Sequence, residues 1–243
     1  MCCNGTVGVG LYYGCEVDSE YQELYTLLTC ESCLQGFSHP VFDCQEWDEP
    51  AWDLQHFLHL KRHLPSIMDG NRRKMVERVI KGFEKHVQPK LPSFKRGFIH
   101  GDPHWSNVIA HVRNGEYHVA GVVDFCDCSN SYCVFDLAIM LADCATSESE
   151  DPIASIGPIL CGYVAACPLC EEEIGCLYDL ILARLCQVAV LTDVLLRTEQ
   201  KNAYLASIPG PAWKFMEDLV NTPREVVNRI WSEARRKCAV DFS

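Results

Sequence analysis

The chain has 243 residues, of which 48% are hydrophobic, enough to bury the core of one domain. Its 21 basic and 33 acidic residues give a formal net charge of −12. This charge repels nucleic-acid phosphates and anionic membrane surfaces, and no local basic patch offsets it, so we expect neither nucleic acid nor a membrane as a partner.

The apolar periodicity of the chain predicts helices at both ends of a short β-rich region. In chain order, helices are expected over Tyr21–Leu34, Trp52–His63, Asn71–Val87, Val134–Cys144, Ile153–Cys167, Glu171–Arg197 and Ala212–Lys237. Between them, runs of β-branched and aromatic residues flank Asn114-Gly115, the strongest short hairpin signal. A single hairpin among helices predicts an α+β domain that is mostly α-helical.

Charge and cysteine usage indicate a cytoplasmic protein. The first residues lack the basic and apolar segments of a secretory signal, and the most apolar stretch, Leu177–Leu196, contains three charged residues, which favours a core helix. Among 16 cysteines, Cys30/Cys33 and Cys167/Cys170 have the spacing of zinc or redox pairs. We interpret them mainly as structural thiols in a reducing compartment, with a metal site as the alternative.

The hairpin also predicts where three polar side chains meet. With Asn114 and Gly115 as turn residues, position 107 pairs with position 122, and Asn107 and Asp124 become diagonal neighbours about 7–8 Å apart. An amide oxygen and a carboxylate are hard ligands that suit magnesium. Asp102, on a turn at the same end of the hairpin, can then accept or orient the proton of an attacking hydroxyl group during phosphoryl transfer.

Three further side chains are candidates around this centre. His100 is expected to fix the loop through hydrogen bonds rather than to act as a base. His104 and Asp127 have two open interpretations, a contact with substrate or phosphate and an ordinary exposed loop position.

His100-Gly101-Asp102, Asn107, Val123-Asp124-Phe125 and Asp136-Leu137-Ala138, in this order and spacing, resemble the signature of aminoglycoside phosphotransferase-type kinases. The resemblance implies a protein-kinase-like C-lobe with Asp102 as catalytic base and Asn107 and Asp124 as magnesium ligands. It also implies that Asp136 supports the catalytic loop. The donor would be GTP or ATP, and the acceptor a small molecule.

A finer resemblance, to the family of hydroxylysine kinases, extends from about Leu34 to Ala234. Its segments are Trp52–Leu54, Val123–Asp127, Tyr132–Asp136 and Val226–Trp231. It implies a phosphotransferase with an alcohol group as acceptor, using GTP to phosphorylate 5-hydroxy-L-lysine, an amino-acid alcohol. The sequence leaves the choice between GTP and ATP open, together with the acceptor and the oligomeric state.

Two departures from the family pattern bear on function. Cys126 stands where the family usually has Gly, directly after Asp124-Phe125. The nucleotide-clamping N-lobe is expected to be absent, with residues 1–20 an atypical N-terminal segment and residues 21–243 the C-lobe. Two other functions therefore remain as alternatives: an inactive C-lobe that serves as a binding or regulatory module or is a non-functional isoform, and a thiol-rich zinc or redox protein.

Overall fold

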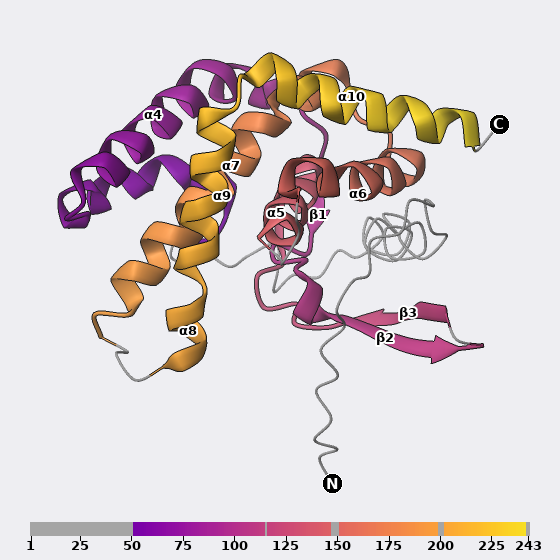
Figure 1. The fold of residues 1–243 in the computed structure, drawn as a ribbon, viewed down its shortest axis with the longest axis horizontal. Coiled ribbons are helices and arrows are strands. Elements are labelled where there is room, and N and C mark those ends of the chain that lie inside the picture. Colours follow the sequence, from indigo (N-terminus) through magenta and orange to yellow (C-terminus); the bar gives the residue numbers. More distant parts are fainter. Residues whose placement is uncertain (1–50, 115, 147–150, 199–201, 242–243) are drawn as a thin grey trace, which may run out of the picture.

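The computed structural model describes residues 51–114, 116–146, 151–198 and 202–241. The predicted helix Tyr21–Leu34 and the Cys30/Cys33 pair lie outside these ranges. The elements in chain order are η1 (Leu54–Ser66), α4 (Gly70–His86), η2 (Gln88–Ser93), β1 (Arg96–Ile99), η3 (Trp105–Asn107), β2 (Val108–Arg113), β3 (Glu116–Val122), β4 (Ser129–Tyr132), α5 (Cys133–Ala145), α6 (Pro152–Ala166), α7 (Glu171–Leu195), α8 (Ala203–Ser207), α9 (Pro209–Asn221) and α10 (Arg224–Asp241). The fold is mostly helical, with β1 beside α5 and the β2–β3 hairpin below the helices (Figure 1).

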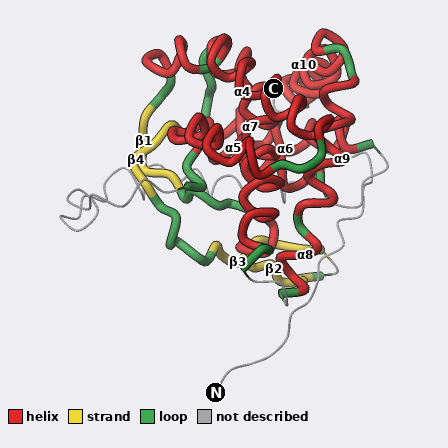
Figure 2. Tube along the Cα trace, turned by 90° about the vertical axis from the view of Figure 1, so that its left-hand side faces the viewer, coloured by secondary structure: helices red, strands yellow, loops and turns green. Residues whose placement is uncertain are grey.

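The strands form two small sheets, so the prediction of a single hairpin was incomplete. β2 and β3 form the hairpin that Asn114-Gly115 predicts. β1 and β4 form a second antiparallel pair, in which Ile99 lies opposite Ser129. Figure 2 shows β1 and β4 against the helical body and β2 and β3 below it. The second pair was missed because its strands are only four residues long and are separated by the whole hairpin.

The register of the hairpin differs from the simple prediction. Residues 110–113 pair as a two-residue turn requires, but a bulge between Ile109 and Ala110 shifts the remainder by one residue. Val108, rather than residue 107, therefore lies opposite Val122. Asn107 comes one step further along, where its carbonyl accepts a hydrogen bond from the Val123 N–H at 2.9 Å. The bulge thus brings Asn107 directly beside the segment that carries Asp124.

Two predicted helices differ in form. The segment predicted as Trp52–His63 is helical, but it winds as a 3₁₀ helix from Leu54 to Ser66. Its buried residues Leu54, Phe57 and Leu60 recur every three positions, and side chains three apart share one face in a 3₁₀ helix. The single helix predicted over Ala212–Lys237 is two helices, α9 and α10, because Pro223 forces the preceding residue into an extended conformation.

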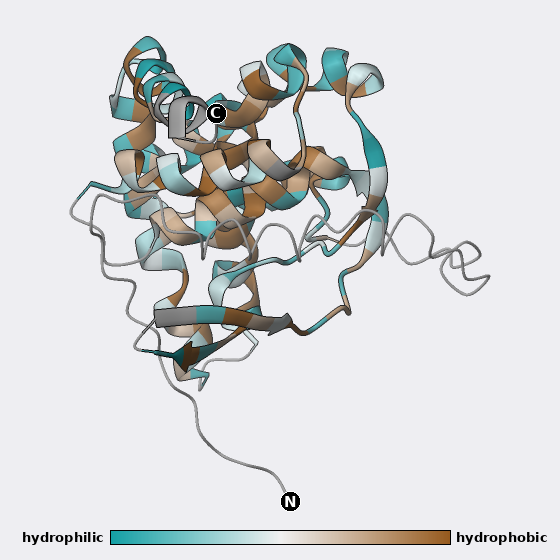
Figure 3. Cartoon of the chain, turned by 90° about the vertical axis from the view of Figure 1, so that its right-hand side faces the viewer, coloured by the Kyte–Doolittle hydropathy of each residue, from teal (hydrophilic) through white to brown (hydrophobic). Residues whose placement is uncertain are grey.

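Helix α7 forms the centre of the core and explains how the helices pack. It contacts α4, α5, α9 and η1, and most of its residues are buried. Within the described ranges, α7 is the one helix with the length and apolar character of a membrane span, and 83% of its most apolar stretch is buried in the protein. Figure 3 shows the apolar residues concentrated where the helices pack together. α7 is therefore the core helix of this domain.

The cysteines in the described ranges mostly act as small core residues. Cys176 and Cys186 of α7 are fully buried, and Cys144 of α5 is 7% exposed. Cys167 is buried, and Cys170 is the N-cap residue of α7, where its backbone N–H donates to Glu173. No group of three or more His, Cys, Asp or Glu side chains that could hold a metal ion occurs among the residues that the structure describes.

Candidate active site

The candidate active site is built on the loop that runs from His100 to Asn107, between β1 and β2. Asp136, in the first turn of α5, holds the start of this loop with both carboxylate oxygens. Its Oδ2 accepts the His100 N–H at 2.8 Å, and its Oδ1 accepts the Gly101 N–H at 2.9 Å. Burial outweighs these two bonds and raises the pKa of Asp136 to about 6. One buried carboxylate therefore fixes the backbone of two successive loop residues.

The His100 ring connects this loop to the segment after β3. His100 is buried, its Nε2 lies 3.0 Å from the Val123 carbonyl, and its Nδ1 accepts the Asp102 N–H at 3.3 Å. A carbonyl only accepts hydrogen bonds, so Nε2 donates in this contact. The ring also packs on Phe125, with the centroids 4.9 Å apart. His100 thus holds the loop and the Asp124 segment together.

Gly101 allows a close approach between these two segments. Its φ of +83° lies in the left-handed region, and a Cβ atom at this position would come within 2.2 Å of the Asp127 carbonyl oxygen. Only glycine satisfies both conditions without strain. The loop before Asp102 and the loop after Asp124 are therefore in contact through a position that has no side chain.

Asp102 follows Gly101, and both of its carboxylate oxygens have partners. Arg184 of α7 donates from Nη2 to Oδ1 at 2.7 Å, and His104 Nε2 lies 3.2 Å from Oδ2. Burial alone would raise the pKa of Asp102, but the His104 hydrogen bond and the Arg184 charge outweigh it and lower this pKa below its usual value. Each carboxylate oxygen has two lone pairs, so Asp102 can still accept a further hydrogen bond from an acceptor hydroxyl.

His104 is oriented from both sides of its ring. Its Nδ1 accepts the Ser106 N–H at 3.3 Å, which caps η3, and its Nε2 faces Asp102. Burial lowers the pKa of His104, but the hydrogen bond and the charge of Asp102 outweigh it and leave the pKa raised. His104 therefore orients the Asp102 carboxylate, together with Arg184 on the opposite side.

Asn107 and Asp124 supply the oxygen donors that a divalent cation would need. The Asn107 amide group donates from Nδ2 to the Asp102 carbonyl oxygen at 2.9 Å, which leaves the amide oxygen as its donor for a cation. Asp124 has a φ of +64°, a conformation that Asp tolerates better than most residues. One amide oxygen and one carboxylate fit magnesium, which usually completes its shell with phosphate oxygens and water.

Cys126, the departure from the family pattern, has an ordinary backbone conformation. In the described part of the chain, the non-glycine residues with positive φ are Asn114 and Asp124. Position 126 therefore does not require the conformational freedom of glycine. The thiol of Cys126 is exposed and hydrogen-bonds Asp124, whose negative charge raises the pKa of the thiol. The substitution of Gly by Cys leaves the path of this segment unstrained.

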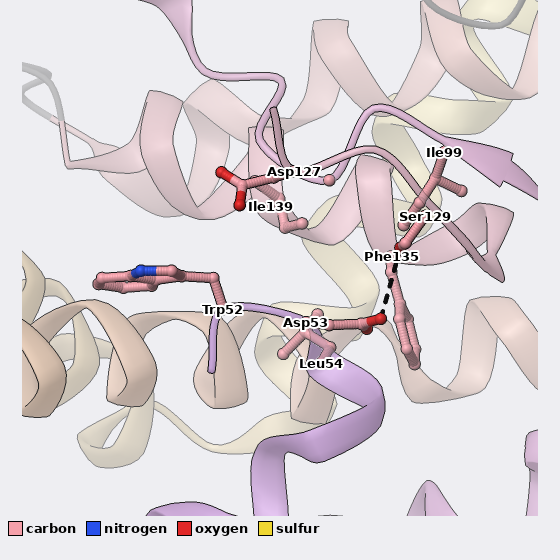
Figure 4. A pocket seen from close by; sticks show the side chains of 9 residues that line it. Trp52, Asp53, Leu54, Ile99, Asp127, Ser129, Phe135 and Ile139 are labelled. Carbon is pink, nitrogen blue, oxygen red and sulfur yellow. Dashed lines mark hydrogen bonds between the residues drawn. The ribbon is translucent and has the colours of Figure 1, made fainter. Parts of the chain in front are cut away.

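A small, open pocket lies beside the loop, and the roughly 280 Å³ of empty space around it includes the open solvent in front of it. Trp52 and Asp127 lie on opposite sides of the opening, while Asp53 is turned toward Ser129 (Figure 4). Asp53 accepts hydrogen bonds from the Gln55 N–H at 2.8 Å and the Ser129 hydroxyl at 3.4 Å, so its role is structural. Burial and the charge of Asp102 raise the pKa of Asp127, which projects beside the pocket.

Two charged residues of this site were not among the candidates from the sequence. Arg184 is buried in α7 and pairs with Asp102 across 82 positions of sequence. Asp143 of α5 accepts the Trp105 N–H at 3.1 Å, and burial raises its pKa. The available signal was the position of each charge inside a strongly apolar helix, since such a charge is rarely buried without a partner.

Residues 33–157 match the Phosphotransferase enzyme family (APH), which is just over half of the chain. The chain belongs to this family. Among curated relatives, the hydroxylysine kinase of Xenopus laevis is 29% identical over 82% of this chain and 55% of its own length. That of Mus musculus is 27% identical over 94% of this chain and 63% of its own length. The chain therefore spans little more than half the length of these relatives.

The solved structures support the same fold. Amicoumacin kinase hAmiN, solved in complex with AMP-PNP and Ca²⁺, aligns with a TM-score of 0.53 over 82% of this chain and 59% of its own chain. The sequence identity is 17%, so this likeness concerns the fold alone. The described part of the chain therefore has a kinase-like fold that is mostly helical with small sheets.

Proposed function

We propose that this chain carries the phosphoryl-transfer centre of a small-molecule kinase that phosphorylates the hydroxyl group of 5-hydroxy-L-lysine. The observation that carries the proposal is Asp102, a carboxylate kept ionised and oriented by Arg184 and His104 beside the amide of Asn107. The relatives named hydroxylysine kinase supply the acceptor, and the family resemblance supplies GTP as the preferred donor over ATP.

In this proposal, Asp102 accepts a hydrogen bond from the acceptor hydroxyl and receives its proton as the oxygen attacks the γ-phosphate in line. Asn107 and Asp124 would hold a magnesium ion, which would supply positive charge to neutralise the phosphate oxygens. Asp136 and His100 hold the loop backbone, so the carboxylate is placed before the substrate binds. Preorganised geometry of this kind supplies much of the catalysis in phosphoryl transfer, since the protein forms no covalent intermediate.

His104 and Asp127 have different proposed roles. His104 orients Asp102 and therefore acts through it. Asp127 lies beside the pocket, across from Trp52, and a carboxylate and an indole ring together suit an ammonium group of the acceptor. Hydroxylysine carries two such groups, so we assign Asp127 to the acceptor rather than to the phosphate.

The direct test is turnover by the purified 243-residue chain. It is incubated with Mg²⁺, 5-hydroxy-L-lysine and either GTP or ATP, and phosphohydroxylysine is measured by mass spectrometry. L-Lysine, which lacks the hydroxyl group, is the matched acceptor control. Asp102→Asn is expected to lower turnover by about 10²-fold or more, the usual contribution of a positioned general base.

The alternative is a catalytically inactive C-lobe that serves as a binding or regulatory module. This alternative predicts no turnover and no detectable binding of GTP or ATP by titration calorimetry. Phosphohydroxylysine formation that Asp102→Asn leaves unchanged would contradict the assignment of the base. Turnover with a different amino-acid alcohol, but not with 5-hydroxy-L-lysine, would support the phosphoryl-transfer reaction and contradict the proposed acceptor.

A further inference from the structure

Arg184 joins two parts of the site that are far apart in the sequence. It lies in α7 with its side chain 8% exposed, and its Nη2 donates to Asp102 Oδ1 at 2.7 Å. Its Nη1 donates to the Trp52 carbonyl at 3.3 Å, and the guanidinium carbon lies 5.5 Å from the centre of the Trp52 ring. One planar group therefore contacts both the candidate base and a wall of the adjacent pocket.

The next turn of α7 strengthens the same link. Gln187 is 1% exposed, and its Nε2 lies 3.2 Å from the Ala51 carbonyl and 3.3 Å from the Asp53 carbonyl. Together with Arg184, it supplies donors to three successive carbonyl groups, those of residues 51, 52 and 53. The segment that leads into η1 is thus fixed on α7, and the fixed segment carries Trp52 of the pocket.

We propose that Arg184 is a positioning residue of the transfer reaction, which holds the Asp102 carboxylate and the Trp52 pocket wall in one fixed arrangement. The inference rests on the proposed function, because it concerns the acceptor that the base and the pocket would share. An acceptor bound against Trp52 then presents its hydroxyl group to a carboxylate at a set distance and orientation.

The geometry requires a guanidinium group in particular. Its N–H groups point in different directions within one rigid plane. Two acceptors bound to Nη1 and Nη2 are therefore held at a fixed distance and orientation relative to each other. A lysine ammonium group carries the same charge on a flexible stem and at a single point. Arg184→Lys therefore keeps the charge beside Asp102 but loses the rigid connection to the Trp52 carbonyl.

The experiment compares Arg184→Lys, Arg184→Gln and Arg184→Ala with a control at Arg224. Arg224 also forms a partly buried ion pair with α7, through Asp179 at 2.6 Å, and it lies outside the site, over the Tyr178 ring. Arg224→Gln thus removes a comparable interaction of the core. Steady-state kinetics with 5-hydroxy-L-lysine and thermal unfolding are measured for all variants.

We expect kcat to fall by about 10-fold for Arg184→Lys and about 100-fold for Arg184→Gln, as for a misplacement of about 1 Å. The KM values for donor and acceptor should change by less than about threefold, because the loss concerns the reacting geometry. Millimolar guanidinium should restore part of kcat in Arg184→Ala and have no such effect on Arg224→Gln. A purely structural role would instead lower kcat and thermal stability in parallel for both arginines.

A second measurement does not depend on turnover. Amide hydrogen exchange of residues 51–54 and 100–104 should increase together in Arg184→Gln and stay unchanged in Arg224→Gln. Exchange that increases in one segment alone would overturn the inference, as would wild-type kcat in Arg184→Gln. A wild-type chain without turnover would contradict the proposed function, and the exchange result would still decide whether Arg184 couples the two segments.

Discussion

Replacement of Asp136 by Asn tests whether this carboxylate positions the loop that begins at His100 without adding to the stability of the fold. The carboxylate accepts the N–H groups of His100 and Gly101 at 2.8 and 2.9 Å. An amide of the same shape keeps one acceptor oxygen and points an NH₂ group at the other N–H. The lost hydrogen bond costs about 1.5–3 kcal/mol, the usual range for a charged acceptor.

A second effect opposes this loss. Burial raises the pKa of Asp136 from 3.8 to about 6, a difference of 6 − 3.8, or about 2 units. At about 1.4 kcal/mol per unit, the ionised carboxylate is disfavoured in the folded protein by about 3 kcal/mol above pH 6, a net value that already includes its two hydrogen bonds, and the neutral amide avoids this net cost. This gain is at least as large as the cost of the N–H left facing the amide NH₂ group, so we expect Asp136→Asn to lower the free energy of unfolding at pH 7.5 by no more than about 1 kcal/mol.

The pH dependence has a definite sign. The pKa is higher in the folded state than in the unfolded state, so the folded protein binds more protons between pH 3.8 and about 6. The contribution of Asp136 to the free energy of unfolding is therefore fully present below pH 3.8 and is lost as the pH rises through about 6. Urea unfolding from pH 4 to 8 should show a steeper fall in the wild type than in Asp136→Asn, because Asp127 and Asp143, whose pKa values are also raised, titrate in both.

Activity should respond differently from stability. In Asp136→Asn, the loop N–H that faces the amide NH₂ group is pushed away, and this moves the backbone next to Asp102. A displacement of the Asp102 carboxylate by about 1 Å should lower kcat by about 100-fold. Asp193→Asn is the matched control, because Asp193 accepts a hydrogen bond from the Trp213 indole at 3.2 Å, outside the loop. A wild-type kcat in Asp136→Asn, or a loss of more than about 3 kcal/mol of stability at pH 7.5, would refute this reasoning.

Three other substitutions test separate parts of the structure. Gly101→Ala should lose most activity and at least about 1–2 kcal/mol of stability, measured by turnover and urea unfolding, because its Cβ would meet the Asp127 carbonyl oxygen in a left-handed conformation. Asp53→Ala should lower stability by about 1–2 kcal/mol through loss of the cap of η1, and a loss under about 0.3 kcal/mol would argue against the cap. Phe57→Ala should cost about 3–5 kcal/mol in unfolding experiments yet leave the KM of the folded enzyme unchanged, since Phe57 is fully buried in the core.

The helices and the hairpin turn could be predicted from sequence because local patterns determine them. Apolar periodicity gave the positions of α4, α5, α6 and α7 to within about two residues, the usual uncertainty of helix ends. Asn114-Gly115 marked the turn because Asn114 adopts a φ of +56° there. The break between α9 and α10 could also have been predicted, because Pro223 disfavours a helical conformation at the residue before it.

The register of the hairpin could not be predicted in the same way. The bulge between Ile109 and Ala110 lies where the hairpin joins the loop that begins at His100, and no local residue pattern specifies it. The pairing of β1 with β4 depends likewise on contacts between segments about 30 residues apart. The sequence therefore predicted which side chains are candidates, whereas tertiary contacts placed Asn107 beside the segment that carries Asp124.

Arg184 shows what a buried charge in an apolar helix implies. In the sequence its charge argued only against a membrane span, although a buried guanidinium needs a partner of opposite charge or a set of carbonyl oxygens. α7 lies at the centre of the core and contacts several helices, so the partner can come from almost any segment. Here it comes from the catalytic loop, at Asp102, and from the segment before η1, at Trp52. The charge of Arg184, in the central helix of the core, thus supports the site in addition to the packing, because an apolar residue at position 184 would leave Asp102 without its ion-pair partner from α7.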